Sequence, residues 1–557
     1  MSSEDSDEGA DEEPFHPLGE AWQDDLEDML DDTEYDTELG MEMGKDAMRV
    51  TKGDLSEEEF HERYHEDVMA EFGEDERPIA SPDDVDEVES ESLLSSLTGD
   101  ESRREVLKKG AAGAGFASLG WGAIDQQEPE QETVEETSDV KHEEDATQWG
   151  MTIDLENCDG CLSCVVACNE EHNWDKGANW MYVLAYEDNQ VESPDPGQLE
   201  DSGVSVHDFN YLVRPCQHCT DAPCEKVCPT TARHTRDQGG LVLTDYDVCI
   251  GCRYCQVACP YGVNYFQWDE PNVDVEEIDP EMMYDQRDRW VSSRAPRGTM
   301  SKCVFDPPRQ DGNMGDELVG TTACEMACPP NVIQFGDKNN PASDPERYND
   351  NPARARTIIN LYAALPSPDA ARSSLQGVDG NLDAVINAVD ELNRGRIALA
   401  TAIQLTQENY EEEAPPGDTL PDKEQSILEV VSAIESTGLT LDSQQTLQQL
   451  GLTVEQFQGP SQDIQVSDRE DVAQQLFDDY VDAPENQFEL LAEMGTNPNV
   501  DYLGHQPGPE AHQVPGPTSY EDVGMLNVRQ KALEDETVGP LGRDVDLGVG
   551  ETSESGH

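Results

Sequence analysis

The sequence predicts an α+β protein in which a cysteine-rich central domain lies between a helical N-terminal region and a helical C-terminal insertion. Two observations lead to this prediction. All 15 cysteines of the 557-residue chain fall between Cys158 and Cys328. The segments before and after this window instead carry apolar residues at helical spacing. Because only 36% of the residues are apolar, we expect a hydrophobic core over only part of the chain.

The charge of the chain excludes one class of partner and indicates an environment. The sequence holds 122 acidic and 34 basic residues, which gives a net charge of −88. Such a chain repels a nucleic-acid duplex, so we expect no nucleic-acid partner. Molar salt shortens the screening length to about 3 Å and makes this self-repulsion tolerable. The spread of charge along the chain favours a halophilic protein over the alternative, a disordered acidic tail at residues 1–100.

Residues 1–95 are predicted to form an acidic, partly helical N-terminal region. Phe60, Tyr64 and Val68 recur at the spacing of one helix face. His61 and His65 are also four residues apart, which would place two imidazoles on one face of this helix. No further ligand is evident in the sequence around them, so we expect surface histidines rather than a metal site.

Residues 100–123 resemble a twin-arginine export signal. Arg103 and Arg104 precede a weakly apolar stretch of small residues from Gly110 to Ala123. This stretch is shorter than the roughly 20 apolar residues of a membrane-spanning helix, so we expect no direct membrane span. The alternative is a basic turn before a small-residue helix, because an export signal normally lies at the N-terminus. The Glu- and Gln-rich residues 124–147 are predicted to be a linker.

The cysteines form four groups whose spacing indicates iron–sulfur binding. The groups are Cys158, Cys161, Cys164 and Cys168; Cys216, Cys219, Cys224 and Cys228; Cys249, Cys252, Cys255 and Cys259; and Cys303, Cys324 and Cys328. The first and third groups have the C-x2-C-x2-C-x3-C spacing of bacterial ferredoxins, in which three thiolates hold one cluster and the fourth reaches its neighbour. Two alternatives fit less well, because three thiols on a tight loop pair poorly as disulfides and structural zinc uses isolated C-x2-C pairs.

Four such groups predict a double ferredoxin-like domain at residues 148–345, built from two two-cluster units. Groups two and three are joined by only 20 residues, so we expect them to exchange their last cysteines, with groups one and four paired around them. The predicted ligand sets are Cys216, Cys219, Cys224 and Cys259; Cys249, Cys252, Cys255 and Cys228; Cys158, Cys161, Cys164 and Cys328; and Cys303, Cys324 and Cys168.

The last of these sets lacks a thiolate, and Asp306 stands where the missing ligand is expected. A carboxylate is a harder donor than a thiolate and binds iron less firmly. We therefore expect three [4Fe-4S] clusters plus a fourth cluster that is either [3Fe-4S] or [4Fe-4S] with Asp306 as a ligand. The alternative is that the fourth cluster is absent.

Beyond the cysteine domain, residues 346–485 are predicted to be a helical insertion, and residues 486–557 a returning segment followed by an extended tail. Two apolar stripes at helical spacing are separated by a break at residues 415–417, which read Pro-Pro-Gly. The stripes hold Leu382, Val385, Ile386, Val389 and Leu392, and then Ile427, Leu428, Val431 and Ile434.

The cysteine motifs and their neighbours are similar to those of one protein family. The strings PCQHC from Pro215, APC from Ala222, CPT from Cys228 and CIGCRYCQVACPYGVNYFQW from Cys249 resemble the four-cluster iron–sulfur beta subunit of the dimethyl sulfoxide reductase superfamily of molybdenum oxidoreductases. The resemblance covers residues 150–345 and resumes at residues 488–503. The family pattern has a cysteine where this chain has Asp306.

This resemblance implies an electron-transfer subunit without catalytic residues of its own. Such a subunit relays electrons between a membrane quinone-reactive anchor subunit and a molybdopterin catalytic subunit of an anaerobic respiratory reductase. Membrane association would come through these partners, on the extracytoplasmic face after twin-arginine export or, alternatively, on the cytoplasmic face. A soluble polyferredoxin or an electron-distribution module of a hydrogenase-like complex is the alternative function.

Overall fold

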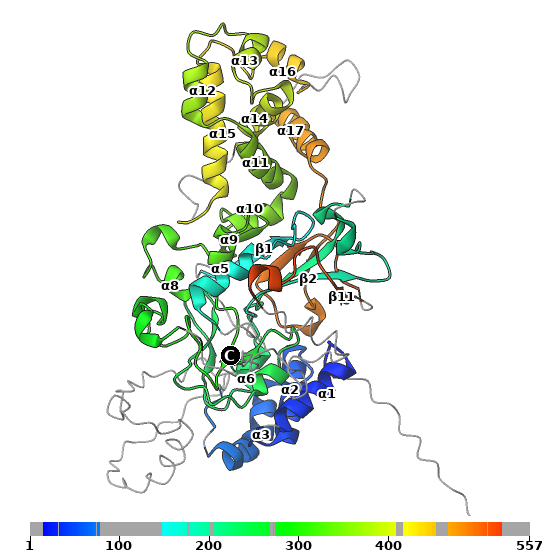
Figure 1. Cartoon of the computed structure of the whole chain (residues 1–557), viewed down its shortest axis with the longest axis vertical. Helices are drawn as coiled ribbons and strands as arrows, with labels where there is room; N and C mark the ends of the chain where they lie inside the picture. The colour runs from blue at the N-terminus through cyan, green and yellow to red at the C-terminus, as the bar shows by residue number, and fades with distance from the viewer. Residues whose placement is uncertain are drawn as a thin grey trace, which may run out of the picture.

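A computed structural model describes most of the chain (Figure 1). The described residues are 15–31, 33–73, 75–77, 147–174, 179–199, 204–267, 271, 273–407, 416–452, 466–508 and 511–525. The twin-arginine segment at residues 100–123 and all but residue 147 of the linker lie outside them. No helix in the described ranges is long and apolar enough to cross a membrane. The mixture of helices and short strands agrees with the predicted α+β class.

The central sheet joins the two ends of the cysteine domain to a segment from far along the chain. Its four strands run in the order β8-β1-β10-β9. Their bounds are β1 Trp149–Asp154, β8 Ile333–Asp337, β9 Gln487–Glu489 and β10 Val500–Leu503. β1 pairs antiparallel with β8 and parallel with β10. The C-terminal segment therefore completes the sheet after the whole helical insertion has intervened.

Three smaller sheets and several short helices make up the rest of the cysteine domain. The sheet β11-β2-β3 contains β2 Tyr182–Glu187, β3 Asn210–Arg214 and β11 His512–Val514. The two hairpins contain β4 Arg233–Thr235 with β5 Val242–Thr244, and β6 Tyr265–Phe266 with β7 Met300–Ser301. The α-helices are α5 Ser163–His172, α6 Pro223–Lys226, α7 Tyr254–Val257, α8 Pro307–Gln310 and α9 Ala323–Met326. Short 3-10 turns are η1 Pro196–Gln198, η2 Val206–Asp208, η3 Val275–Glu277, η4 Pro280–Met282, η5 Asp316–Leu318, η7 Ala492–Met494 and η8 Glu521–Val523.

The N-terminal region forms a three-helix cap that packs on the cysteine domain, at the lower end of the molecule in Figure 1. Its helices are α1 Glu20–Asp31, α2 Thr37–Thr51 and α3 Glu57–Phe72. α2 approaches α7 so closely that a Cβ added at Gly44 would lie 2.5 Å from Cγ1 of Val257. The Tyr254 hydroxyl donates to the carbonyl of Asp36 at 2.7 Å. The described residues of this acidic region, 15–31, 33–73 and 75–77, are therefore a packed part of the domain rather than a disordered tail.

The helices after the cysteine domain form a second hydrophobic core at the opposite end of the molecule (Figure 1). They are α10 Asp344–Asp350, α11 Pro352–Ala364, α12 Pro368–Ser374, α13 Leu382–Ala388, α14 Arg394–Leu405, α15 Leu420–Glu435, α16 Gln444–Leu450 and α17 Val466–Tyr480. Both predicted apolar stripes supply buried residues, among them Val385 and Ile434. A buried ion pair joins this unit to the central sheet, because Arg356 Nε donates to Oδ2 of Asp154 at 2.7 Å.

Candidate metal-cluster sites

All 15 cysteines are free thiols in the cysteine domain, and all but Cys161 and Cys328 are buried. In each of the four groups, the residue two positions after the first cysteine has a positive φ: Gly160 62°, His218 42°, Gly251 71° and Phe305 58°. This left-handed turn points the N–H of that residue back at the sulfur, as in the 3.4 Å contact from His218 N–H to Cys216 Sγ. The fourth group therefore shares the local loop geometry of the other three.

The same N–H contact to the first cysteine recurs at Gly160, Gly251 and Phe305. Burial nevertheless raises the pKa of the thiols of Cys158 and Cys249 to about 12. A protonated buried thiol is a poor nucleophile, whereas a bound metal would hold it as thiolate. These buried thiols with raised pKa values therefore suit the binding of a resident metal cluster rather than catalysis by a reactive thiolate.

The first three cysteines of group one lie together with Cys328, the last cysteine of the chain. Burial raises the pKa of the Cys164 thiol well above its ordinary value, and the neighbouring sulfurs of Cys158, Cys328 and Cys161 raise it further. Cys328 lies just before β8, and Cys158 lies just after β1. The antiparallel pairing of β1 with β8 thus closes this four-thiol group over a long stretch of sequence.

Groups two and three exchange their last cysteines in space. One internal cavity is lined by Cys216, Cys219, Cys224 and Cys259. A second is lined by Cys228, Cys249, Cys252 and Cys255. The hairpin of β4 and β5 connects the two groups in sequence and turns the chain back, so that each group supplies one thiol to its neighbour.

The spacing of the sulfur atoms distinguishes these cavities from zinc sites. Tetrahedral zinc with bonds of about 2.3 Å would place its sulfurs about 3.8 Å apart. Among the described residues, no cysteine group brings three sulfur atoms within 4.8 Å of one another. The four-thiol cavities are too wide for a single zinc ion and fit a larger multi-iron cluster.

Arg233 is buried at the second cavity, and its charge also acts on Cys224 and Cys216 of the first, although no sequence motif marks this residue. Its Nη2 is 3.7 Å from Cys255 Sγ and donates to Oδ1 of Asn264 at 2.8 Å. Its backbone N–H points at Cys228 Sγ at 3.3 Å. Its Nε and Nη1 are buried without a hydrogen-bond partner in the described structure. Because an unpaired buried donor is costly, these two atoms fit the acceptor sulfurs that a bound cluster would provide.

The fourth ligand set combines the thiols of Cys168, Cys303 and Cys324 with a carboxylate. Burial raises the pKa of the Cys168 thiol well above its ordinary value, with Cys303, Asp306 and Cys324 adding to the effect in that order. These four side chains come from α5, from the loop before α8 and from α9. Asp306 therefore stands beside the three thiols, in the place that a fourth sulfur takes in the other groups.

Hydrogen bonds occupy both carboxylate oxygens of Asp306. His172 Nε2 lies 2.6 Å from Oδ1, the Ala323 N–H donates to Oδ2 at 2.7 Å, and Arg309 Nε lies 3.7 Å from Oδ2. Burial opposes ionisation of Asp306, but His172, Arg309 and the Ala323 N–H outweigh it and lower its pKa. The sequence analysis missed His172, although its position four residues after Cys168 on one helix placed it on the same face.

His218, which lies inside the second group, is held by the protein at both ring nitrogens. The Val242 N–H donates to Nδ1 at 3.1 Å, which leaves Nε2 to donate to the carbonyl of Cys303 at 3.0 Å. The ring stacks on Phe305 with centroids 3.9 Å apart. His218 thus packs between groups two and four and has no free nitrogen for iron.

Two family models match the chain. The N-terminal region of 4Fe-4S ferredoxin iron–sulfur binding matches residues 16–80, and a 4Fe-4S dicluster domain matches residues 207–277. Together with the cysteine groups, they define the chain as an iron–sulfur protein of the ferredoxin class. The first match also extends the resemblance to the three-helix cap, beyond the 150–345 range expected from the cysteine motifs.

Several relatives specify the family. A Halobacterium salinarum protein named as an iron–sulfur subunit of dimethyl sulfoxide reductase is 36% identical over 202 residues, which is 36% of this chain and 71% of that protein. The menaquinone reductase iron–sulfur cluster-binding subunit of Nitratidesulfovibrio vulgaris is 39% identical over 215 residues, 35% of this chain and 77% of that protein. The arsenate respiratory reductase iron–sulfur subunit ArrB of a Shewanella species is 33% identical over 216 residues, 35% of this chain and 83% of that protein. The chain belongs to the iron–sulfur electron-transfer subunits of the dimethyl sulfoxide reductase family.

Proposed function

We propose that this chain binds four iron–sulfur clusters in a double ferredoxin-like core. The ligand sets are Cys158, Cys161, Cys164 and Cys328; Cys216, Cys219, Cys224 and Cys259; Cys228, Cys249, Cys252 and Cys255; and Cys168, Cys303 and Cys324 beside Asp306. The observation that carries this proposal is the gathering of thiols distant in sequence into four separate groups. When bound, each cluster would supply reversible one-electron transfer.

The fourth cluster in this proposal is of the [3Fe-4S] type. His172 and the Ala323 N–H each donate to one oxygen of Asp306, and these hydrogen bonds compete with metal ligation by the same carboxylate. Arg309 adds a second positive charge near the same carboxylate. These contacts favour an Asp306 that closes the pocket as a buried anion over an Asp306 that binds a fourth iron.

The proposed role is to relay electrons between a membrane quinone-reactive subunit and a molybdopterin catalytic subunit of an anaerobic respiratory reductase. Support comes from the relatives, whose names place them in menaquinone and arsenate respiratory reductases. The part of this chain in the relay is to hold the clusters, to exclude water from them and to keep neighbouring cavities close together. Arg233, which contacts Cys228 and Cys255 in one central cavity and is close enough to act electrostatically on Cys224 and Cys216 of the other, exemplifies this short separation.

Co-purification from the native organism tests this role against the alternative of a soluble polyferredoxin or hydrogenase-like module. We expect a molybdenum-containing chain and a membrane protein to accompany the subunit in mild detergent. Isolation as a soluble protein without either partner would contradict the relay role, while leaving the cluster assignment testable by iron content.

We further propose that the partners hold the subunit on the extracytoplasmic face of the membrane of a halophile, after twin-arginine export. The pair Arg103-Arg104 and the net charge of −88 support this placement. Replacing both arginines by lysine should retain the protein in the cytoplasm. An unchanged location in the doubly substituted protein would contradict export and favour the cytoplasmic face.

A further inference from the structure

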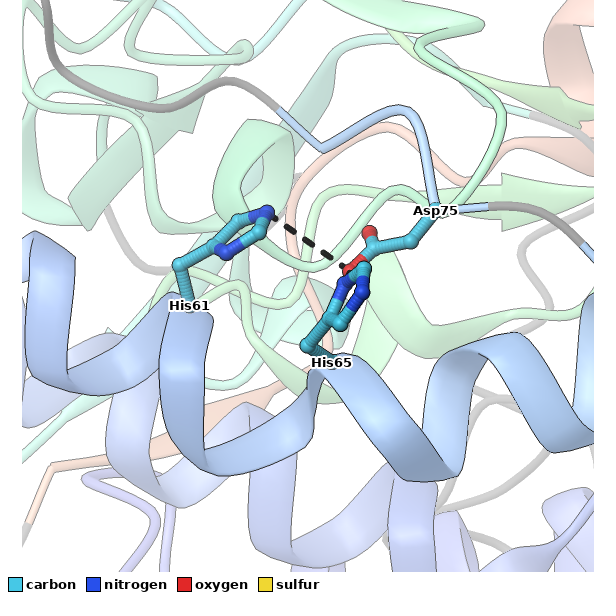
Figure 2. Close-up of side chains that lie close together, drawn as sticks. All are labelled: His61, His65 and Asp75. Atoms are coloured by element: carbon cyan, nitrogen blue, oxygen red, sulfur yellow. Dashed lines mark hydrogen bonds and ion pairs between the residues drawn. The ribbon is translucent and has the colours of Figure 1, made fainter.

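A second group of metal-ligating side chains lies in the three-helix cap, away from the cysteines. Among the described residues, His61, His65 and Asp75 are the one set of three or more His, Cys, Asp or Glu side chains whose ligand atoms all lie within 4.8 Å of one another. The two histidines lie one turn apart on α3, and Asp75 reaches them from the segment that follows the helix (Figure 2). Surface histidines were predicted here because the sequence shows no third ligand near them.

The distances are close to those of a metal site. His65 Nδ1 lies 2.8 Å and His61 Nε2 lies 3.6 Å from the same oxygen, Oδ2 of Asp75. The two imidazole rings are stacked with centroids 5.5 Å apart. Bonds of about 2.0–2.1 Å in a tetrahedral zinc site would place ligand atoms about 3.3 Å apart. Shifts of about half an ångström would therefore bring each histidine nitrogen to this distance from Oδ2.

Arg77 holds the carboxylate in place from the opposite side. Its Nε donates to Oδ1 of Asp75 and its Nη2 to Oδ2, both at 2.7 Å, and Nη2 also lies 3.3 Å from the carbonyl of His61. Oδ2 retains a second lone pair, which faces the histidines. Such outer hydrogen bonds orient the ligating carboxylates of known metal sites. The Asp75 side chain is fully buried, while that of His65 is half exposed and leaves a route from solvent.

The protonation states suit metal ligands. Burial lowers the pKa of His61, which makes its imidazole neutral at neutral pH. Burial opposes ionisation of Asp75, but its hydrogen bonds with Arg77 and His65 lower its pKa below the ordinary value. Two imidazole nitrogens and one carboxylate oxygen form a donor set that prefers zinc and similar ions over calcium or magnesium.

We propose that His61, His65 and Asp75 bind a divalent transition-metal ion, Zn²⁺ or one of similar chemistry, which clamps residues 75–77 onto α3. This segment is also joined to the cysteine domain, because the Glu76 N–H donates to the carbonyl of Pro229 at 3.1 Å. Pro229 directly follows Cys228, which lines one of the four-thiol cavities. The ion would thus fasten the cap beside a cluster-binding loop, independently of the proposed electron relay.

Zinc binding by the full-length, cluster-loaded protein tests this proposal. The protein is equilibrated with a zinc buffer in molar KCl, which screens weak binding to the acidic surface, and desalted before zinc and iron are measured by elemental analysis. We expect the unaltered protein to retain about one more zinc ion per chain than His65→Ala, at equal iron content. The half-exposed position of His65 makes this substitution compatible with folding.

Two control variants and one second ligand variant sharpen the measurement. His207→Ala removes an exposed histidine elsewhere, and Glu66→Gln removes one charge from the exposed face of α3, so both should bind zinc as the unaltered protein does. Asp75→Asn should lose the ion as His65→Ala does. Equal zinc in all variants would overturn the proposal and leave only a hydrogen-bonded His65–Asp75 pair. Zinc uptake matched by loss of iron would also overturn it, because the cysteine sites would then be the binding site.

Discussion

The four-thiol group around Cys219 and the group around Asp306 have the same loop. They differ in the side chain that stands three residues after the first cysteine, which is Cys219 in one group and Asp306 in the other. In both, the residue two positions after the first cysteine has a positive φ, at His218 and Phe305 respectively. The first group places the thiol of Cys219 three residues after its first cysteine. The second places a carboxylate there, and His172 and the Ala323 N–H bind its oxygens. The backbone therefore defines a ligand position, while neighbouring side chains decide whether that position has a donor for metal.

The largest expected effect comes from removing the side chain three residues after the first cysteine of each group. Cys219→Ala should lose its cluster, about four iron atoms per chain, because no other thiol lines that corner of the cavity. Asp306→Ala should leave the iron content unchanged, because the carboxylate binds protein donors rather than iron. Iron analysis of the two purified proteins checks this difference. Equal iron loss in both variants would mean that Asp306 is a ligand.

Asp306→Cys should make the fourth group resemble the other three. A thiol at this corner provides the missing soft donor, so the cluster should gain about one iron atom and become [4Fe-4S]. Electron paramagnetic resonance of the oxidised protein should then lose a three-iron signal that the unaltered protein shows. The absence of that signal from the unaltered protein would contradict the three-iron assignment, and Asp306→Asn serves as a control without a thiol.

A substitution of Arg233 tests the buried charge beside the central four-thiol groups. Arg233→Gln removes a cation that contacts Cys255 and Cys228 and also acts on Cys224 and Cys216, which should lower the reduction potentials of both central clusters by on the order of 50–100 mV. Arg233→Lys should restore much of this shift. Redox titration followed by spectroscopy measures the potentials, and the cluster beside Asp306 should stay unchanged. Equal shifts in all clusters would indicate a general structural change instead.

The smallest expected effect comes from a substitution in the three-helix cap, which should affect the cluster near Cys255 but not the Asp306 group. Gly44→Leu forces a side chain into Val257 and should destabilise the cap by about 1–3 kcal/mol. Chemical denaturation measures this loss. The cluster near Cys255 should become more sensitive to oxygen, because α2 packs on α6 and α7, whereas the Asp306 group should keep its stability. Lys45→Leu, at an exposed position of the same helix, is the matched control for a new leucine in the cap.

The sequence was sufficient for the class of site but not for its details. Ferredoxin spacing pointed to the cysteines and to Asp306, which stands where a cysteine is expected. This was possible because the thiols of a cluster-binding loop follow one another closely in sequence. Helical periodicity also identified α3 and the second stripe of the insertion, since a buried helix face repeats every three to four residues. The first stripe was right only to Ala388, where α13 ends, because Val389 and Leu392 are buried outside that helix. His172 and Arg233 were missed, because each acts on groups that are brought near it only by folding.

By itself, the sequence determined that this is an iron–sulfur electron-transfer subunit of the dimethyl sulfoxide reductase family, with an incomplete fourth cysteine group. Only the tertiary structure decided that the three-helix cap packs on α7, that His172 and the Ala323 N–H bind the two oxygens of Asp306, and that Asp75 joins His61 and His65. The physical reason is the separation along the sequence of the residues that interact. Spacing along the chain specifies a loop, but the partners of a buried charge come from distant segments and depend on the path of the whole backbone.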